Sequence, residues 1–174
     1  VWYAGTRRET IVVPAGSSSA WSRKNYAVVG SSGQDELEFR ALTSSPVGVF
    51  IDDCFLMPYN PATTDQILRN GNFEDDGRLP PGASLETPVF IGWSTGKHYD
   101  ILMHDLGVAG NGFDGKNVMH LREKRAIFQQ VYVVPAQSYQ LSFAFSPNPA
   151  DDRARSFTVS FAGQILETVA VPVS

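Results

Sequence analysis

Three acidic residues are candidates for ion pairing or metal coordination. Asp52 and Asp53 are adjacent inside the apolar run VGVFIDDCFL, and Glu74 closes the phrase NGNFE. A carboxylate in apolar surroundings is costly unless it is paired or coordinated, and hard oxygen ligands of this kind suit Ca²⁺. The sequence therefore predicts a structural calcium site at Glu74 with Asp52 or Asp53. The alternative is that Asp52 faces water while Asp53 accepts backbone hydrogen bonds.

A second group of residues combines aromatic rings with hydrogen-bonding side chains. Sugars present apolar C–H faces and many hydroxyls, so binding them needs a flat ring beside groups that donate and accept hydrogen bonds. The candidates for a glycan-binding surface are Trp93, His98, Tyr99, Asn117, His120 and Gln129. Two alternatives stay open: Trp93 packs in the core after the Gly92 turn, and Gln129 belongs to the polar outer face of a strand.

The sequence contains no motif for phosphate binding, serine hydrolysis or zinc-dependent hydrolysis. The sequence has no glycine-rich phosphate loop, no serine elbow and no HExxH segment, and its three histidines do not have zinc-site spacing. Nothing beside Asp52 and Asp53 points to a hydrolase, so the protein is predicted not to be an enzyme. The single cysteine, Cys54, has no internal partner and is interpreted as a small core residue.

In the segments that should position these candidate residues, apolar side chains occur at every second position. In SYQLSFAFS the apolar residues Tyr139, Leu141, Phe143 and Phe145 alternate with Ser, Gln and Ala, and SFTVSFAG and ELEFRAL alternate in the same way. This spacing is expected for strands with one buried face. Clusters of Gly, Pro, Asn and Asp separate the segments, and no window has a capped helical stripe. The prediction is an all-β fold, an antiparallel β-sandwich of jelly-roll type.

Composition narrows the partners and the compartment. Charged residues make up only 18% of the 174 residues, a balance common in extracellular β proteins, and the net charge of −4 argues against a nucleic-acid footprint. No apolar stretch approaches the roughly 20 residues that cross a bilayer. The first residue is not Met, so we expect a mature product or a piece of a longer chain. The predicted location is extracellular, at a cell wall or cell surface.

Several sequence motifs, most of them in the second part of the chain, occur together as they do in one protein family. After ILRNGNFEDD come IGWSTGKHYDIL, FDGKNVMHL, AIFQQVYVVPAQSYQLSFAFS and FTVSFAG, and VGVFIDDCFL precedes them. Together they resemble the galactose-binding-like β-sandwich family, in particular carbohydrate-binding modules and the DUF642 proteins of cell walls. The resemblance implies a glycan ligand and a structural Ca²⁺ near Asp52, Asp53 and Glu74. The sequence departs from the pattern at Cys54, where the family usually has Val, and lacks the cysteines of the plant proteins.

The order of these phrases is unusual, because the family's ending phrase, Ile51-Asp52-Asp53, comes before its starting phrase at Asn70–Glu74. The segment PYNPATTDQ between them has two prolines and no periodicity, as linkers do. We therefore predict that 1–58 is the C-terminal part of one β-sandwich, that 59–65 is a linker, and that 66–174 is the N-terminal part of a second β-sandwich.

The two ends of the chain share one phrase. VWYAGTRRETIVVPAG at the start and VSFAGQILETVAVPVS at the end match at seven of sixteen positions, at an offset of 158. Such a match indicates an internal repeat. We predict that the N-terminal strands pair with a neighbouring copy rather than with the C-terminal part of their own chain, in a head-to-tail array. A chain of this kind could also be a structural repeat of an extracellular filament that binds no sugar.

Overall fold

The computed structural model describes nine stretches of the chain: residues 8–12, 21–44, 48–59, 65–75, 84–87, 89–95, 101–105, 113–147 and 155–171. They form thirteen strands and, within these residues, no helix. The strands make two sheets with antiparallel pairing throughout. The prediction of an all-β, antiparallel fold is confirmed.

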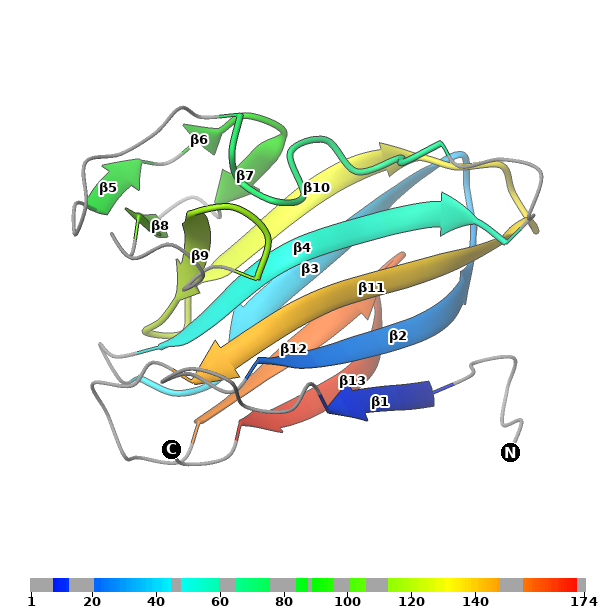
Figure 1. Cartoon of the computed structure of the whole chain (residues 1–174). Coiled ribbons are helices and arrows are strands. Elements are labelled where there is room, and N and C mark those ends of the chain that lie inside the picture. Colours follow the sequence, from blue (N-terminus) through cyan, green and yellow to red (C-terminus); the bar gives the residue numbers. More distant parts are fainter. Residues whose placement is uncertain are drawn as a thin grey trace.

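One sheet has seven strands (Figure 1). In spatial order they are β1 (Arg8–Val12), β2 (Ser22–Val29), β11 (Ser138–Pro147), β4 (Val49–Pro58), β9 (Asn117–Leu121), β8 (Ile101–Asp105) and β5 (Ser84–Thr87). The other sheet has six strands. Their order is β13 (Gln164–Val171), β12 (Arg155–Phe161), β3 (Gln34–Ala41), β10 (Ala126–Tyr132), β7 (Trp93–Thr95) and β6 (Val89–Phe90).

The core lies between the two sheets, and the predicted alternation supplies it. Leu141 and Phe143 of β11 are fully buried, as are Leu37 and Phe39 of β3 in the opposite sheet. The rings of Phe39 and Phe143 meet edge to face with their centres 4.8 Å apart, an arrangement favoured between aromatic rings. Cys54 is buried in the same cluster, as its sequence context predicted.

The pairing of the two segments differs from the sequence prediction. Strands β2 and β4, which precede residue 59, lie on either side of β11 in the seven-stranded sheet. Strand β3 lies between β10 and β12 in the other sheet. The N-terminal strands therefore pair within their own chain: β3 and β4 each lie between two strands of the C-terminal part, and β2 lies between β11 and β1. Strand pairing does not test whether the two segments derive from successive sandwich units, so that division stays a prediction.

The described residues contain no helix of sufficient length and apolar character to span a membrane. Of the predicted linker 59–65, the structure describes Tyr59 and Asp65, whereas 60–64 lie outside the described residues.

Candidate functional site

A bulge in the middle of β4 places the two adjacent acids. Ser142 of β11 pairs with Phe55 and Ala144 pairs with Asp52, so that Asp53 and Cys54 both stand opposite the single residue between them. Asp53 has a φ of +46°, a conformation that residues other than glycine rarely adopt. Bulges of this kind occur often beside functional sites and re-aim side chains. Here the bulge gives Asp52 and Asp53 different partners.

The Asp52 carboxylate is fully buried and accepts three backbone hydrogen bonds. Its Oδ2 atom accepts from the N–H groups of Phe113, at 2.7 Å, and Asp114, at 3.0 Å. Its Oδ1 atom accepts from Asp53 N–H at 2.7 Å. Burial raises the pKa of Asp52 to about 8, against the opposing effect of the three N–H donors. The alternative in which Asp52 faces water is wrong, because Asp52 is buried and is the acid held by the backbone.

The raised pKa of Asp52 predicts that stability falls as pH rises. The folded protein keeps the Asp52 proton up to about pH 8, whereas the unfolded chain loses it near 3.8, the ordinary pKa of an aspartate. Asp52 thus favours the folded state most at pH values below 3.8, and this contribution is lost between there and about pH 8. One proton gives a slope of at most about 1.4 kcal/mol per pH unit. Urea unfolding of the wild type and Asp52→Asn at several pH values should show this slope only in the wild type, and equal slopes would contradict the assignment.

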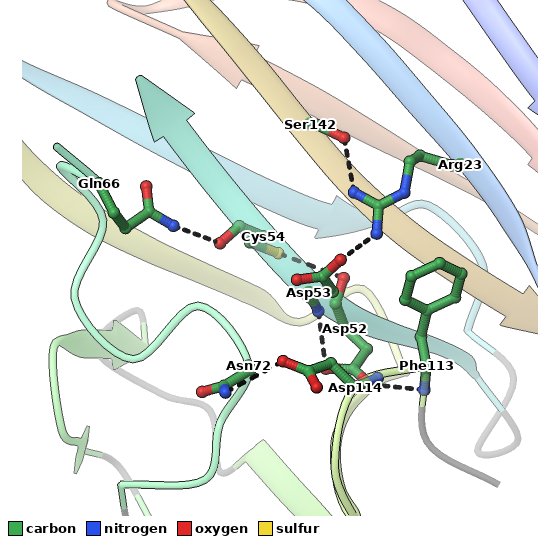
Figure 2. A network of polar contacts seen from close by, with 9 residues as sticks. All are labelled: Arg23, Asp52, Asp53, Cys54, Gln66, Asn72, Phe113, Asp114 and Ser142. Atoms are coloured by element: carbon green, nitrogen blue, oxygen red, sulfur yellow. Dashed lines mark hydrogen bonds and ion pairs between the residues drawn. The ribbon is translucent and has the colours of Figure 1, made fainter. Parts of the chain in front are cut away.

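Asp53 is paired with an arginine on the outer face of the sheet. Figure 2 shows the Arg23 guanidinium of β2 between the Asp53 carboxylate and the Ser142 hydroxyl, to which it also donates at 2.9 Å. Its Cζ atom lies 4.5 Å from the ring centre of Phe113 and 5.5 Å from that of Phe55. These contacts hold the guanidinium in one position and fix the direction of Asp53.

Residues 65–75 run beside the bulge and complete one wall of the site. The Gln66 side chain accepts from Leu56 N–H at 2.8 Å and donates to the Cys54 carbonyl at 3.0 Å. The Gly71 carbonyl accepts from Cys54 N–H, and a Cβ atom at Gly71 would collide with the Cys54 carbonyl. Only glycine therefore permits this approach, which explains one residue of the NGNFE phrase.

Glu74 fixes the 113–117 turn, which forms the opposite wall of the site. Its Oε1 atom accepts from the N–H groups of Lys116 and Asn117, both at 2.6 Å. Gly115 between the two walls has a φ of +79°, and a Cβ atom there would collide with the Glu74 carboxylate. Asp52 binds the start of the 113–117 turn and Glu74 binds its end. Two of the three acids that the sequence singled out, Asp52 and Glu74, therefore bind the same turn through its backbone.

A polar cleft of about 290 Å³ opens between the bulge, the 65–75 segment and the turn. Leu68, Gly71 and Cys54 contribute to its walls. Its polar lining consists of three acids and three amides: Asp53, Asp75, Asp114, Gln66, Asn70 and Asn72. Asn72 Nδ2 donates to Asp114 Oδ2 at 3.3 Å, and this contact joins the two walls (Figure 2). The cleft is the feature of the described residues that best combines a hollow with several hydrogen-bonding side chains.

The predicted calcium ligands do not fit a cation in this arrangement. The Asp52 oxygens and Glu74 Oε1 accept from backbone N–H groups, whose positive ends repel a metal ion. Asp53 is paired with Arg23. Across the stretches that the structure describes, no group of three or more His, Cys, Asp or Glu side chains could hold a metal ion. Calcium at these residues remains a prediction from the family resemblance, and a chelator experiment tests it.

The predicted glycan-binding residues are not gathered on one surface. Trp93 is 1% exposed and Asn117 is fully buried, while His120 and Gln129 are 4% and 5% exposed. Their polar atoms bind the protein itself: Trp93 Nε1 donates to the Asn70 carbonyl at 2.9 Å, and His120 Nε2 accepts from Gly48 N–H at 2.9 Å. The prediction for these four residues is therefore corrected: they are internal, and a sugar cannot reach them in this structure. His98 and Tyr99 lie outside the described residues.

In comparisons with known proteins, no family model, curated protein or solved structure matches the chain significantly.

Sequence reasoning missed most of the cleft. Asn70, Asn72 and Asp75 belong to the NGNFEDD phrase, whose dense polar residues were a usable signal. Arg23 gave no signal, because nothing in SRKNYAVV distinguishes it from a solvated strand residue. Its role depends on Asp53, thirty positions away, and the two meet only because β2 and β4 pair with opposite edges of β11.

Proposed function

We propose that this protein is a non-catalytic extracellular module that binds glycans through the cleft beside the β4 bulge. The observation that carries the proposal is the concentration of six acid and amide side chains around one hollow of about 290 Å³. This volume is close to the lower end of known ligand pockets. A cleft of this size suits one sugar ring of a longer chain.

The lining matches the hydrogen-bonding needs of a polyhydroxylated ligand. A carboxylate accepts hydrogen bonds from hydroxyls, and an amide both donates and accepts. Asp75 and Asp114 are exposed, and Asn72 is partly exposed, so solvent hydroxyls reach them. Asp53 and Gln66 are held by neighbours, which orients the site before a ligand arrives and lowers the entropy cost of binding. The apolar contribution comes from Leu68 and Cys54.

A binding role fits these residues better than a catalytic one. General acid–base catalysis by two carboxylates needs both groups within reach of substrate. Asp52 is buried under three backbone donors, and Asp53 is paired with Arg23. The galactose-binding-like classification and the jelly-roll topology belong to the same proposal, since they imply a glycan ligand for a sandwich of this kind.

Array screening followed by titration of selected variants tests the proposal. We expect the wild type to bind oligosaccharides on a broad array of cell-wall and cell-surface glycans. Asp114→Ala and Asn72→Ala should each weaken binding of the strongest hit by about tenfold, because each loses a hydrogen bond worth about 1.5 kcal/mol. Gln130→Ala, an exposed change on the opposite sheet, is the matched control. An array without signals, or equal affinities in all four proteins, would overturn the proposal.

The burial of Trp93 favours a second candidate, a structural repeat of an extracellular filament or tandem array. None of the described residues that line the cleft is aromatic, whereas most sugar sites use an aromatic ring. A structural module would show no array signals and would associate with copies of itself. The same array experiment therefore separates the two candidates.

A further inference from the structure

The amide side chains in the lining of the cleft are largely engaged by the protein itself. Gln66 and Asn70 donate to main-chain carbonyls at 3.0 and 3.1 Å, and their amide oxygens accept from main-chain N–H groups at 2.8 and 2.9 Å. Asn72 Nδ2 donates to Asp114 Oδ2 at 3.3 Å. Each amide nitrogen therefore commits one of its two N–H groups within the chain, and few side-chain donors are left for a ligand.

Carboxylate oxygens are the acceptors that stay open to a ligand. Asp75 and Asp114 are both exposed. Among the described residues, no donor reaches the Asp75 carboxylate, and Asp114 accepts only from Asn72, through Oδ2. Asp53 pairs with Arg23 through Oδ2, which leaves its Oδ1 atom available. The cleft therefore offers mainly acceptors, and its ligand must supply the donors.

The charges in the lining have one sign. Among the described residues that line the cleft, three are acidic and none is Lys, Arg or His. Arg23 is paired with Asp53 and lies over the Phe113 ring, 4.5 Å from its centre. Figure 2 shows the Arg23 guanidinium on the far side of the Asp53 carboxylate from Asn72 and Asp114. Because a cleft lined by charges of one sign concentrates ligands of the opposite sign, this cleft favours a cationic ligand.

The spread of the carboxylates favours an organic cation over a metal ion. A calcium ion needs six to eight oxygen ligands that converge on one point, and within the described stretches no three acidic side chains are placed to hold a metal ion. The acids of the lining instead surround a hollow of about 290 Å³. An ammonium group on a larger molecule fits this arrangement, since it has three N–H donors and no acceptor.

We propose that this cleft selects amino sugars, which carry an ammonium group on the sugar ring, and rejects uronic acids. This selection rests on the proposed glycan-binding function, of which it names the ligand class. The exposed carboxylates of Asp75 and Asp114 accept from the ammonium group, and ring hydroxyls donate to the other open oxygens. A uronic acid brings a carboxylate to the same position, where it meets like charges and finds few donors.

Titration of the full chain with three matched oligosaccharides tests the selection. Oligomers of glucosamine, glucose and glucuronic acid with the same linkage and length differ mainly in charge. In a mildly acidic buffer of low ionic strength, which keeps the amine protonated, the glucosamine oligomer should bind about tenfold more tightly than the glucose oligomer, because charge-assisted hydrogen bonds are the stronger ones. The glucuronic acid oligomer should bind most weakly. Added salt should reduce these differences, since it screens exposed charges.

Substitutions that remove only charge identify the residues responsible. Asp75→Asn and Asp114→Asn keep the size of the side chain and one oxygen acceptor. Each should lower the affinity for the glucosamine oligomer by about tenfold and change that for the glucose oligomer by less than about twofold. Asp65→Asn is the matched control, because Asp65 is an exposed acid of the same 65–75 segment that does not line the cleft. It should bind all three oligomers as the wild type does.

The outcomes separate this selection from glycan binding itself. If the three oligomers bind equally, or the glucuronic acid oligomer binds most tightly, the selection is wrong while glycan binding in the cleft is unaffected. A preference for glucosamine that survives both cleft substitutions, or that Asp65→Asn abolishes equally, would overturn the proposal, because its cause would lie outside Asp75 and Asp114. So would saturable binding of Ca²⁺ alone that Asp75→Asn removes, since the cleft would then be a metal site. If no oligosaccharide binds, here or on the array, the proposed function itself fails.

Discussion

Replacing Trp93 by alanine should lower the free energy of unfolding by about 3–5 kcal/mol, the range for removing a buried large aromatic side chain. The indole is 1% exposed and packs between Phe39 and Phe73, with ring centres 6.1 and 5.6 Å away. Alanine would leave a cavity between the sheets. It would also leave the Asn70 carbonyl without the indole N–H that it accepts at 2.9 Å. Urea unfolding followed by circular dichroism measures the difference.

Two control variants separate core packing from a surface role. Trp93→Phe keeps a ring in the core and loses the hydrogen bond, so it should cost less than Trp93→Ala. Tyr132→Ala removes an aromatic side chain that is 77% exposed and should change stability by less than about 0.5 kcal/mol. If Trp93→Ala were as stable as the wild type, Trp93 would be a surface residue and would again be a candidate for binding a sugar.

Glu74→Ala should destabilise the fold by about 2–4 kcal/mol. Oε1 of Glu74 accepts from the N–H groups of Lys116 and Asn117, and leaving a partly buried donor without a partner costs about 1–3 kcal/mol. Glu74→Gln keeps an oxygen acceptor and should recover most of the loss. Thermal and urea unfolding of the three proteins measure the order.

A chelator distinguishes this backbone role from calcium binding. If Glu74 holds only the turn, EDTA leaves the melting temperature of the wild type unchanged. If Glu74 is a calcium ligand, EDTA lowers the melting temperature to that of Glu74→Ala, and added Ca²⁺ restores it. A ligand at a hundredfold excess over its Kd stabilises the native state by about 2.7 kcal/mol, which is easily measured.

The strands were predictable because their signal is local. The alternation of Tyr139, Leu141, Phe143 and Phe145 is visible in nine consecutive residues, and all four side chains are buried. Burial of one sheet face imposes this period wherever a strand lies. The order of strands in the sheets depends instead on contacts between distant segments, which is why the pairing of β2–β4 was predicted wrongly.

The candidate site was predictable only in part, for a related reason. Gln129 is polar but buried, because its side chain accepts from Arg69 N–H at 2.7 Å and donates to the Arg69 carbonyl at 2.9 Å. From its residue type alone, Gln129 could equally well be a sugar-binding amide or a buried structural one. Asp52 was recognised as needing a partner, yet its partners are backbone N–H groups of Phe113 and Asp114. A backbone group has no sequence signature, so only the folded structure identifies it.

A two-dimensional ¹H–¹⁵N NMR titration with the strongest oligosaccharide from the array tests the cleft most directly. Amide signals are assigned residue by residue, so the titration places the ligand on the fold without any substitution. We expect saturable shifts for Asp53, Asn72, Asp75 and Asp114, and none for Gln34 and Gln130 on the opposite sheet. Binding without shifts at these cleft residues, or shifts confined to another surface, would contradict glycan binding in the cleft.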